Sequence, residues 1–250
     1  MIVRQAANVL DLLEYFAKVK RQSNLGEISA ALGWPRSSTF NLLTTLAERG
    51  FLYEPRPRAG YYPTSRWASL LRAIAETELL PDDLCKAVDE VARVTGETAA
   101  IAAPMGTTAV LLYVVESPEV VRFTAEAGYQ LPIHASSAGR ALLAQYSSSE
   151  RASVLKKVRF EKYAERTPLN AKQVEAEIKR ATARGWHENI EGYAAHLSGV
   201  AVPVGLPDRC LSLVVGGPSQ RMRNRIPQIA ATLKRELKRH VSELIAPHAD

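Results

Sequence analysis

Two short helical segments joined by one glycine constrain this chain more than any other feature of its sequence. Asn24 and Glu27 have the spacing of a capping box at the start of the first segment, and Gly33 can take the left-handed conformation that ends it. Pro35 suits the first turn of the second segment, which runs to about Arg49. Two helices joined by a tight glycine turn predict a helix-turn-helix unit.

The second of these helices begins with side chains that can hydrogen-bond to DNA. Arg36 can bind guanine bidentately or reach a phosphate, and Asn41 can pair with adenine. The hydroxyl groups between them suit bases or phosphates. Phe40, Leu43 and Leu46 are expected to pack inward. The candidate DNA-contacting residues of this helix are Arg36, Ser37, Ser38, Thr39 and Asn41.

A basic hairpin is predicted after the two helices. Residues 51–53 begin a strand, residues 61–62 resume it, and the segment EPRPRAG lies between them. This pattern is typical of a wing, whose Arg56 and Arg58 would lie against phosphates or in the minor groove. The alternative is that these two arginines only keep the hairpin soluble.

The excess positive charge of the chain is concentrated in the same region. Residues 1–66 hold nine Lys and Arg against five Asp and Glu, a net charge of +4 out of +6 for the whole chain. A basic module favours a polyanionic partner, although charge alone fits a soluble surface equally well. With an amphipathic helix over residues 6–16, we expect a winged helix-turn-helix domain over residues 1–64 that binds double-stranded operator DNA. The alternative is a small helical unit with a hairpin that binds no DNA.

Residues 65–80 predict a linker helix. Its apolar side would pack in the core or against another protomer, because an isolated helix of this length is marginally stable. That side is formed by Trp67, Leu70, Leu71 and Ile74.

Residues 81–250 predict an α+β domain with a mainly antiparallel sheet and helices on one face. Strand-like runs come first, helices follow, and strands return before a final helix. The expected strands are 97–104, 108–116, 119–127, 196–206 and 209–218. The expected helices are 84–94, 138–145, 149–158, 170–184 and 224–245, with a loop before the second of them.

Catalytic and metal-site motifs are missing from the sequence. It contains no nucleophile elbow, zincin motif, Walker loop or dinucleotide glycine fingerprint, so no catalytic residue and no cofactor are expected. Its two cysteines are far apart, which argues against a disulfide framework or a structural zinc site. Apolar runs are too short to cross a bilayer and the N-terminus does not read as a signal peptide, so we expect a cytoplasmic protein without a membrane partner.

Several polar side chains that could suggest a metal or ligand site are expected at the surface instead. The histidines among them match no standard metal-ligand spacing, and the arginines are expected to be solvated. These residues are His187, Glu191, His196, Arg221, Arg223 and Arg225.

Several ordered blocks together carry a family resemblance. They are GWPRSSTFNLLTTLAERGFL from Gly33, TGET from Thr95, PIHASSAGRALLA from Pro132, GWHENIEGYAAHLSGVAVPV from Gly185 and LSLVVGGPSQR from Leu211. Over essentially its whole length the chain resembles the IclR family of bacterial transcriptional regulators. The resemblance implies a winged helix-turn-helix, a linker helix and a GAF-like effector-binding domain, assembled as a homodimer or homotetramer. A dimer would match a pseudo-palindromic operator.

The effector pocket is expected around the helix that starts near residue 138. Backbone N–H groups at that helix start could hold a carboxylate, but Ser136 and Ser137 could equally serve as simple caps. His134 either bonds the ligand or satisfies a loop carbonyl. The candidate effector-binding residues are Gly128, His134, Ala135, Ser136, Ser137, Ala138, Ser198, Gly199, Val214 and Gly216.

Departures from the family pattern refine these expectations. Asn41 stands where the family often has a basic residue, so operator preference is not carried over. Family members that bind small polar acids often have Cys at the position of Gly199 and serines at those of Val214 and Gly216. A roomier and more apolar pocket is therefore expected here.

These observations predict a transcriptional regulator, and they favour a repressor over an activator. Its effector would be an aromatic or other weakly polar carboxylic acid. The alternative is an enzyme or a ligand sensor that acts through residues 81–250 without operator binding.

Overall fold

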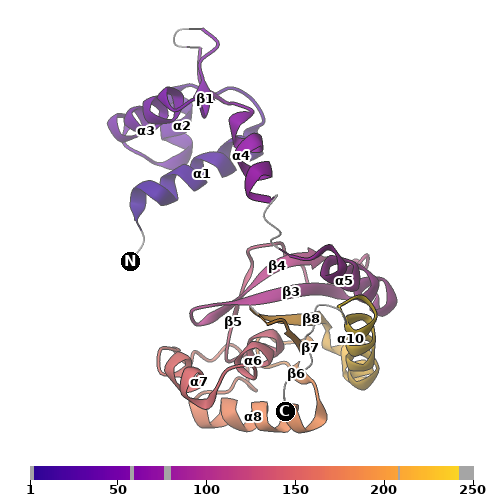
Figure 1. The fold of residues 1–250 in the computed structure, drawn as a ribbon. Coiled ribbons are helices and arrows are strands. Elements are labelled where there is room, and N and C mark those ends of the chain that lie inside the picture. The colour runs from indigo at the N-terminus through magenta and orange to yellow at the C-terminus, as the bar shows by residue number, and fades with distance from the viewer. Residues whose placement is uncertain (1–2, 57–58, 76–79, 208, 242–250) are drawn as a thin grey trace. The chain divides into compact units, whose positions relative to one another are not determined.

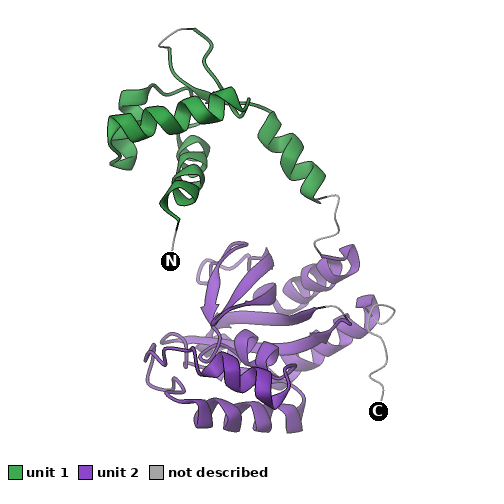
Figure 2. Ribbon diagram, turned by 60° about the vertical axis from the view of Figure 1, so that its left-hand side comes forward, with its two compact units in different colours: residues 1–79 green, residues 80–250 purple. Residues whose placement is uncertain are grey.

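The computed structural model describes residues 3–56, 59–75, 80–207 and 209–241. The chain divides into two compact units, residues 1–79 and residues 80–250, drawn green and purple in Figure 2. Each unit has its own hydrophobic core.

The first unit is built on three helices: α1 (Arg4–Val19), α2 (Leu25–Leu32) and α3 (Arg36–Glu48). The predicted capping box is confirmed, since Asn24 Oδ1 accepts from the Glu27 amide and Glu27 Oε2 accepts from the Asn24 amide. Gly33 ends α2 with a φ of 66°, as the helix-turn-helix pattern requires. The side chains buried between the helices are Leu12, Phe16, Ile28, Leu43, Leu46 and Leu52.

The rotation of α3 about its axis differs from the expectation at two positions. Thr39 is fully buried and donates its hydroxyl to the Pro35 carbonyl, whereas Phe40 is 50% exposed. Thr39 precedes the buried Leu43 by four residues, so the two share one face of the helix. Thr39 is therefore a core residue, and the predictions that it contacts DNA and that Phe40 packs inward are wrong.

The hairpin after α3 pairs β1 (Leu52–Tyr53) with β2 (Tyr62–Pro63) in antiparallel register. Helix α4 (Arg66–Ala75) follows, and Trp67 joins it to the hairpin through a hydrogen bond from Nε1 to the Phe51 carbonyl. The rest of its apolar side is not buried in the single chain, since Leu71 is 62% exposed.

The second unit contains a six-stranded sheet in the order β5-β4-β3-β8-β7-β6, and every pairing is antiparallel (Figure 1). This confirms the predicted α+β class with a mainly antiparallel sheet. The strands are β3 (Thr98–Met105), β4 (Thr108–Val115), β5 (Gln130–Pro132), β6 (His187–Ile190), β7 (Leu197–Gly205) and β8 (Cys210–Pro218).

Helices cover both faces of this sheet, so the prediction of helices on one face is wrong. On one face α5 (Asp82–Thr95) and α10 (Ile226–Val241) pack over alternate residues of β3, β7 and β8. On the other face α6 (Ser137–Leu143) lies over the sheet, with α8 (Ala171–Arg184) beyond it. The remaining short helices are α7 (Ser148–Leu155), α9 (Ser219–Met222) and the 3₁₀ turn η1 (Arg223–Arg225). Both faces of the central strands are apolar, which is why a two-sided burial is possible.

The strand predicted over residues 119–127 does not form. Val120 and Val121 are 94% and 68% exposed, and Arg122 forms an ion pair with Glu116 that closes the segment as a loop. β4 already pairs on one side with β3 and on the other with β5. β5 was not predicted from the sequence because it is only three residues long. β6 was not predicted either, because it has only four residues.

Gly139 allows α6 to lie against the segment before it. A Cβ atom at this position would lie 2.2 Å from the Ile133 carbonyl oxygen and 2.5 Å from Ile133 Cα. Both are backbone atoms, so the contact can be relieved only if the helix or the segment moves.

We expect Gly139→Ala to lower the free energy of unfolding by about 1–3 kcal/mol through this overpacking. Urea unfolding followed by circular dichroism measures the change. The control Lys172→Ala changes an exposed position of α8 and should stay within about 0.5 kcal/mol of the parent chain. Equal stability of the two variants would contradict the close packing of α6.

Candidate DNA-binding and effector sites

The exposed end of α3 presents four of the five predicted DNA-contacting side chains. Arg36, Ser37, Ser38 and Asn41 are exposed, and Thr39 is the buried exception. None of the described carboxylates forms an ion pair with Arg36, so its guanidinium is available to an external anion. Arg56 is exposed on the hairpin, while Arg58 lies outside the described residues.

The first two turns of α1 border the same face of α3. Arg4, Gln5 and Asn8 line a groove together with Ser38 and Asn41. No local pattern places the α1 residues there, because their position beside α3 depends on how the two helices pack.

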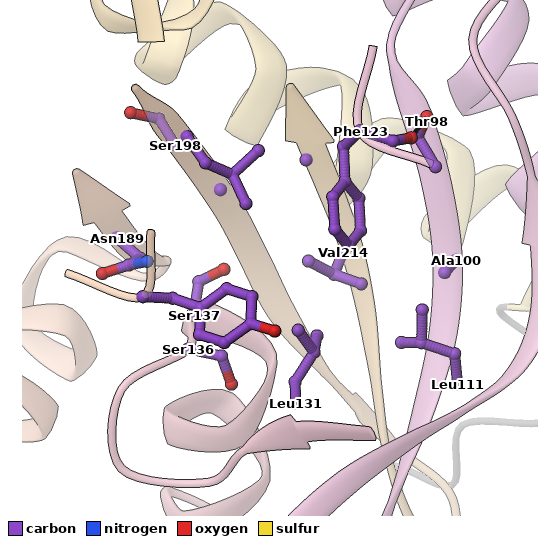
Figure 3. A pocket seen from close by; sticks show the side chains of 14 residues that line it. Thr98, Ala100, Leu111, Phe123, Leu131, Ser136, Ser137, Asn189, Ser198 and Val214 are labelled. Atoms are coloured by element: carbon purple, nitrogen blue, oxygen red, sulfur yellow. Dashed lines mark hydrogen bonds between the residues drawn. The ribbon is translucent and has the colours of Figure 1, made fainter. Parts of the chain in front are cut away.

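A cavity lies between the sheet and α6 in the second unit (Figure 3). Its lining is predominantly apolar and contains no charged side chain. Six of the ten predicted effector residues line it: Ser136, Ser137, Ser198, Gly199, Val214 and Gly216. The other lining residues are Thr98, Ala100, Leu111, Phe123, Leu131, Asn189, Tyr193 and Leu197.

The cavity is small, with a volume of about 40 Å³. A Cβ atom on Gly216 would lie 3.1 Å from Phe123 Cδ1, and one on Gly199 would lie 2.8 Å from Ser137 Oγ. In Figure 3 the Phe123 ring points into the cavity beside Val214. The space that Gly216 and Gly199 leave is therefore filled by the side chains of Phe123 and Ser137.

The start of α6 is capped from within the chain. Ser136 Oγ accepts from the Gly139 amide at 3.0 Å and donates to the Pro132 carbonyl at 2.9 Å. Ser136 is thus an N-cap, as one of the two alternatives held, and it also lines the cavity. Ser137 contributes its hydroxyl to the cavity wall (Figure 3).

Two aromatic side chains that line the cavity, Phe123 and Tyr193, both contact Tyr129. The Phe123 and Tyr129 rings meet edge to face, with their centroids 5.9 Å apart. The Tyr129 and Tyr193 hydroxyl oxygens are 2.9 Å apart. Burial and this hydrogen bond raise the pKa of Tyr193, which therefore stays protonated at neutral pH.

Four predicted effector residues do not line this cavity: Gly128, His134, Ala135 and Ala138. Ala135 and Ala138 are fully buried in the core. His134 lines a separate groove, and its Nε2 lies 3.5 Å from the Glu161 carbonyl oxygen, in agreement with the alternative that it satisfies a loop carbonyl.

Thr98, Phe123, Asn189 and Tyr193 line the cavity but were not among the residues predicted from the sequence. Thr98, Asn189 and Tyr193 belong to blocks that carried the resemblance, so a signal was present for them. Phe123 fell in the segment misread as a strand, and only the loop conformation turns its ring inward.

Three of the polar residues expected at the surface are held in specific contacts. Arg221 pairs through two hydrogen bonds with the buried Glu97, at 2.7 and 2.8 Å. Arg225 donates to the Thr95 carbonyl, and Arg223 pairs with Glu191. The prediction that these arginines are merely solvated is wrong.

His187 is buried in β6, which also differs from the expectation. Its neighbour Arg140, 3% exposed, donates to the carbonyl oxygens of His134 and Glu188, at 3.0 and 2.7 Å. Burial lowers the pKa of Arg140 to about 10, so the guanidinium stays charged at neutral pH. Burial, together with the charges of Arg140 and Arg184, lowers the pKa of His187 to about 3.

In the described part of the chain, no three His, Cys, Asp or Glu side chains gather as a metal ion would require. Among the described helices, none has the length and apolar character of a membrane span.

Two family models match the chain. The IclR helix-turn-helix domain matches residues 5–56, and the bacterial transcriptional regulator IclR C-terminal domain matches residues 81–243. The chain belongs to the IclR family. It is therefore a DNA-binding transcriptional regulator with an effector-binding domain and not an enzyme, as the sequence predicted.

Relatives and solved structures agree with this assignment. The HTH-type transcriptional repressor AllR of Klebsiella pneumoniae is 28% identical, covering 96% of this chain and 89% of that protein. The acetate operon repressor of Salmonella typhimurium is 26% identical, covering 94% and 88%. The IclR structure of Thermotoga maritima has a TM-score of 0.77 at 17% identity, covering 96% and 98%. An IclR homolog of Microbacterium hydrocarbonoxydans, complexed with 4-hydroxybenzoate, has a TM-score of 0.66 at 20% identity, covering 94% and 99%. These structures share the fold of this chain.

The buried His187 makes the stability of the second unit depend on pH. Its folded pKa of about 3 lies below the unfolded value near 6.5, so the unfolded chain takes up the proton first as the pH falls. We expect stability to be full above about pH 6.5 and to fall by about 2 kcal/mol between pH 7 and pH 5. Burial also lowers the pKa of His134, which acts in the same direction.

Urea unfolding at the two pH values tests this, with His187→Gln as the variant and the exposed His196→Gln as its control. The His187 variant should lose most of the pH dependence, and the control should keep it. If His187→Gln does not fold, an NMR titration of the parent chain decides. A His187 imidazole that titrates near pH 6.5 would rule out the buried neutral state.

Proposed function

We propose that this regulator represses its target genes by binding operator DNA, and that a small, weakly polar organic effector relieves the repression. The observation that carries the effector class is the cavity between the sheet and α6, whose lining is predominantly apolar and uncharged. Repression is supported by the curated relatives, which are repressors.

DNA would be contacted by the exposed end of α3, with Arg36, Ser37, Ser38 and Asn41 at the base edges and Arg56 of the wing at a phosphate. Arg4 at the start of α1 would add a phosphate contact beside them, because it shares a groove with Ser38 and Asn41. We propose that residues 1–64 form the DNA-binding domain, residues 65–80 a linker helix and residues 81–250 the effector-binding domain.

The active form would be a homodimer or homotetramer. Leu70 and Leu71 of α4 are 45% and 62% exposed in the single chain, so a second protomer would remove apolar surface from water. A dimer would also place two copies of α3 on the half-sites of a pseudo-palindromic operator.

The effector would be an aromatic or similarly apolar carboxylic acid. One solved neighbour is a complex with 4-hydroxybenzoate, which is consistent with a single-ring acid. A cavity that accepts a benzene ring has a volume of about 150 Å³. Phe123 would therefore have to turn aside when a ring enters.

Arg36→Ala is expected to weaken operator binding by about 1–3 kcal/mol if Arg36 reads a base. Fluorescence anisotropy with DNA from the chain's own upstream region, at a fixed salt concentration, measures the loss. Arg72→Ala, on the exposed surface of α4, is the matched control. A Kd unchanged by Arg36→Ala would remove Arg36 from the DNA interface.

Single-ring acids such as 4-hydroxybenzoate are expected to bind in isothermal titration calorimetry, whereas two- and three-carbon acids such as glyoxylate and pyruvate are not. The bound acid should also weaken operator binding. Tight binding of pyruvate together with no binding of any aromatic acid would refute the proposed effector class.

A further inference from the structure

We propose that Phe40 of α3 reads thymine in the operator, through contact between its ring and the C5-methyl group of the base. This rests on the proposed operator binding by α3. It adds an apolar, base-specific contact to the hydrogen-bonding side chains that are proposed to lie at the base edges.

The first unit does not cover the Phe40 side chain. Helix α3 meets the core of this unit through Thr39, Leu43 and Leu46, and Phe40 lies about 100° around the helix from Thr39. Phe40 is 50% exposed. Within the described residues its ring contacts no other aromatic ring and no cation. A large apolar surface is therefore left in water, and a partner that covers it gains free energy.

Phe40 lies on the part of α3 that carries the proposed DNA-contacting side chains. It follows Arg36 by four residues and Ser37 by three, so the three side chains lie along one face of the helix. Helical side chains lean toward the N-terminus of their helix, so the ring lies over the turn that carries Arg36 and Ser37. Asn41 follows directly and is exposed as well. A recognition helix enters the major groove with this N-terminal end, which places the ring among the base edges.

The C5-methyl group of thymine is the feature of the major groove that a phenyl ring can recognise. The ring has no polar atom, so it cannot make the hydrogen bonds that Arg36 offers to guanine and Asn41 to adenine. Among the four bases thymine alone carries a methyl group at this edge, and Phe is one of the side chains that contact it. The ring therefore favours thymine over the other three bases at the position that it contacts.

A second copy of the chain is the other partner that could cover Phe40. The residues beside the ring argue against it, because Arg36, Ser37 and Asn41 are exposed and polar. The centre of an interface between proteins is depleted of charged residues, whereas DNA presents both polar groups and methyl groups in its major groove. This surface therefore fits DNA better than it fits a second protomer.

Deoxyuridine tests the contact, because it lacks the methyl group of thymine and keeps the same hydrogen-bonding groups. In operator DNA from the chain's own upstream region, each thymine is replaced in turn, and Kd is measured by fluorescence anisotropy at a fixed salt concentration. At one thymine or more, the replacement should raise the Kd of the parent chain about fourfold, as the loss of one buried methyl group predicts. Phe40→Ala should bind the thymine and deoxyuridine operators with the same Kd.

The matched control is Leu10→Ala, which removes an apolar side chain of α1 that is 61% exposed. It should keep the full effect of deoxyuridine. Phe40→Ser repeats the test with a second short side chain, and it decides the matter if Phe40→Ala does not fold.

The possible outcomes separate this contact from operator binding as such. If the parent chain binds no operator, the proposed function fails and the contact fails with it. If the parent chain binds but no thymine is sensitive to deoxyuridine, Phe40 does not read a methyl group and the proposed function stands. An equal deoxyuridine effect in the parent and the Phe40 variants would assign the methyl contact to another side chain. A Phe40 variant that keeps this effect but changes the oligomeric state in light scattering would place the ring in a protomer interface.

Discussion

The close packing of α6 against the sheet and against the segment before it is the constraint on which the second unit depends. Gly139 lets the helix approach within contact of the Ile133 backbone, and Ser136 completes its first turn. On the opposite face α5 and α10 bury the alternate residues of the same strands. The cavity proposed for the effector is the space that remains between α6 and the sheet, so its shape follows from this packing.

A buried cation holds the edges of that cavity in place. Arg140 of α6 donates to the carbonyls of His134 and Glu188, and so ties the segment before α6 to β6. Glu188 precedes Asn189, which lines the cavity. Because an unpaired buried charge is costly, the guanidinium retains these carbonyl partners only if both segments keep their positions. His187 is buried nearby, and its own burial, together with the charges of Arg140 and Arg184, lowers the pKa of its imidazole.

The helix-turn-helix and the cavity suit ligands of different polarity and charge. The end of α3 exposes hydrogen-bonding side chains and a free guanidinium, which suits the polar, charged surface of DNA. The cavity is small, its lining is predominantly apolar and none of its lining side chains is charged, which suits a weakly polar group better than an ion.

By itself the sequence determined the helix-turn-helix, because its capping box, glycine stop and proline start are local interactions between neighbouring residues. The sequence also determined the family, because several motifs occur in the family's order and at its spacing. It further identified six of the residues that line the cavity. Tertiary structure alone decided that Thr39 rather than Phe40 faces the core, since helix rotation follows from packing against other helices. Only the fold could show that residues 119–127 form a loop, that Phe123 fills the space beside Gly216, and that Arg221 reaches Glu97. These outcomes depend on contacts between residues far apart in the chain, which no local pattern records.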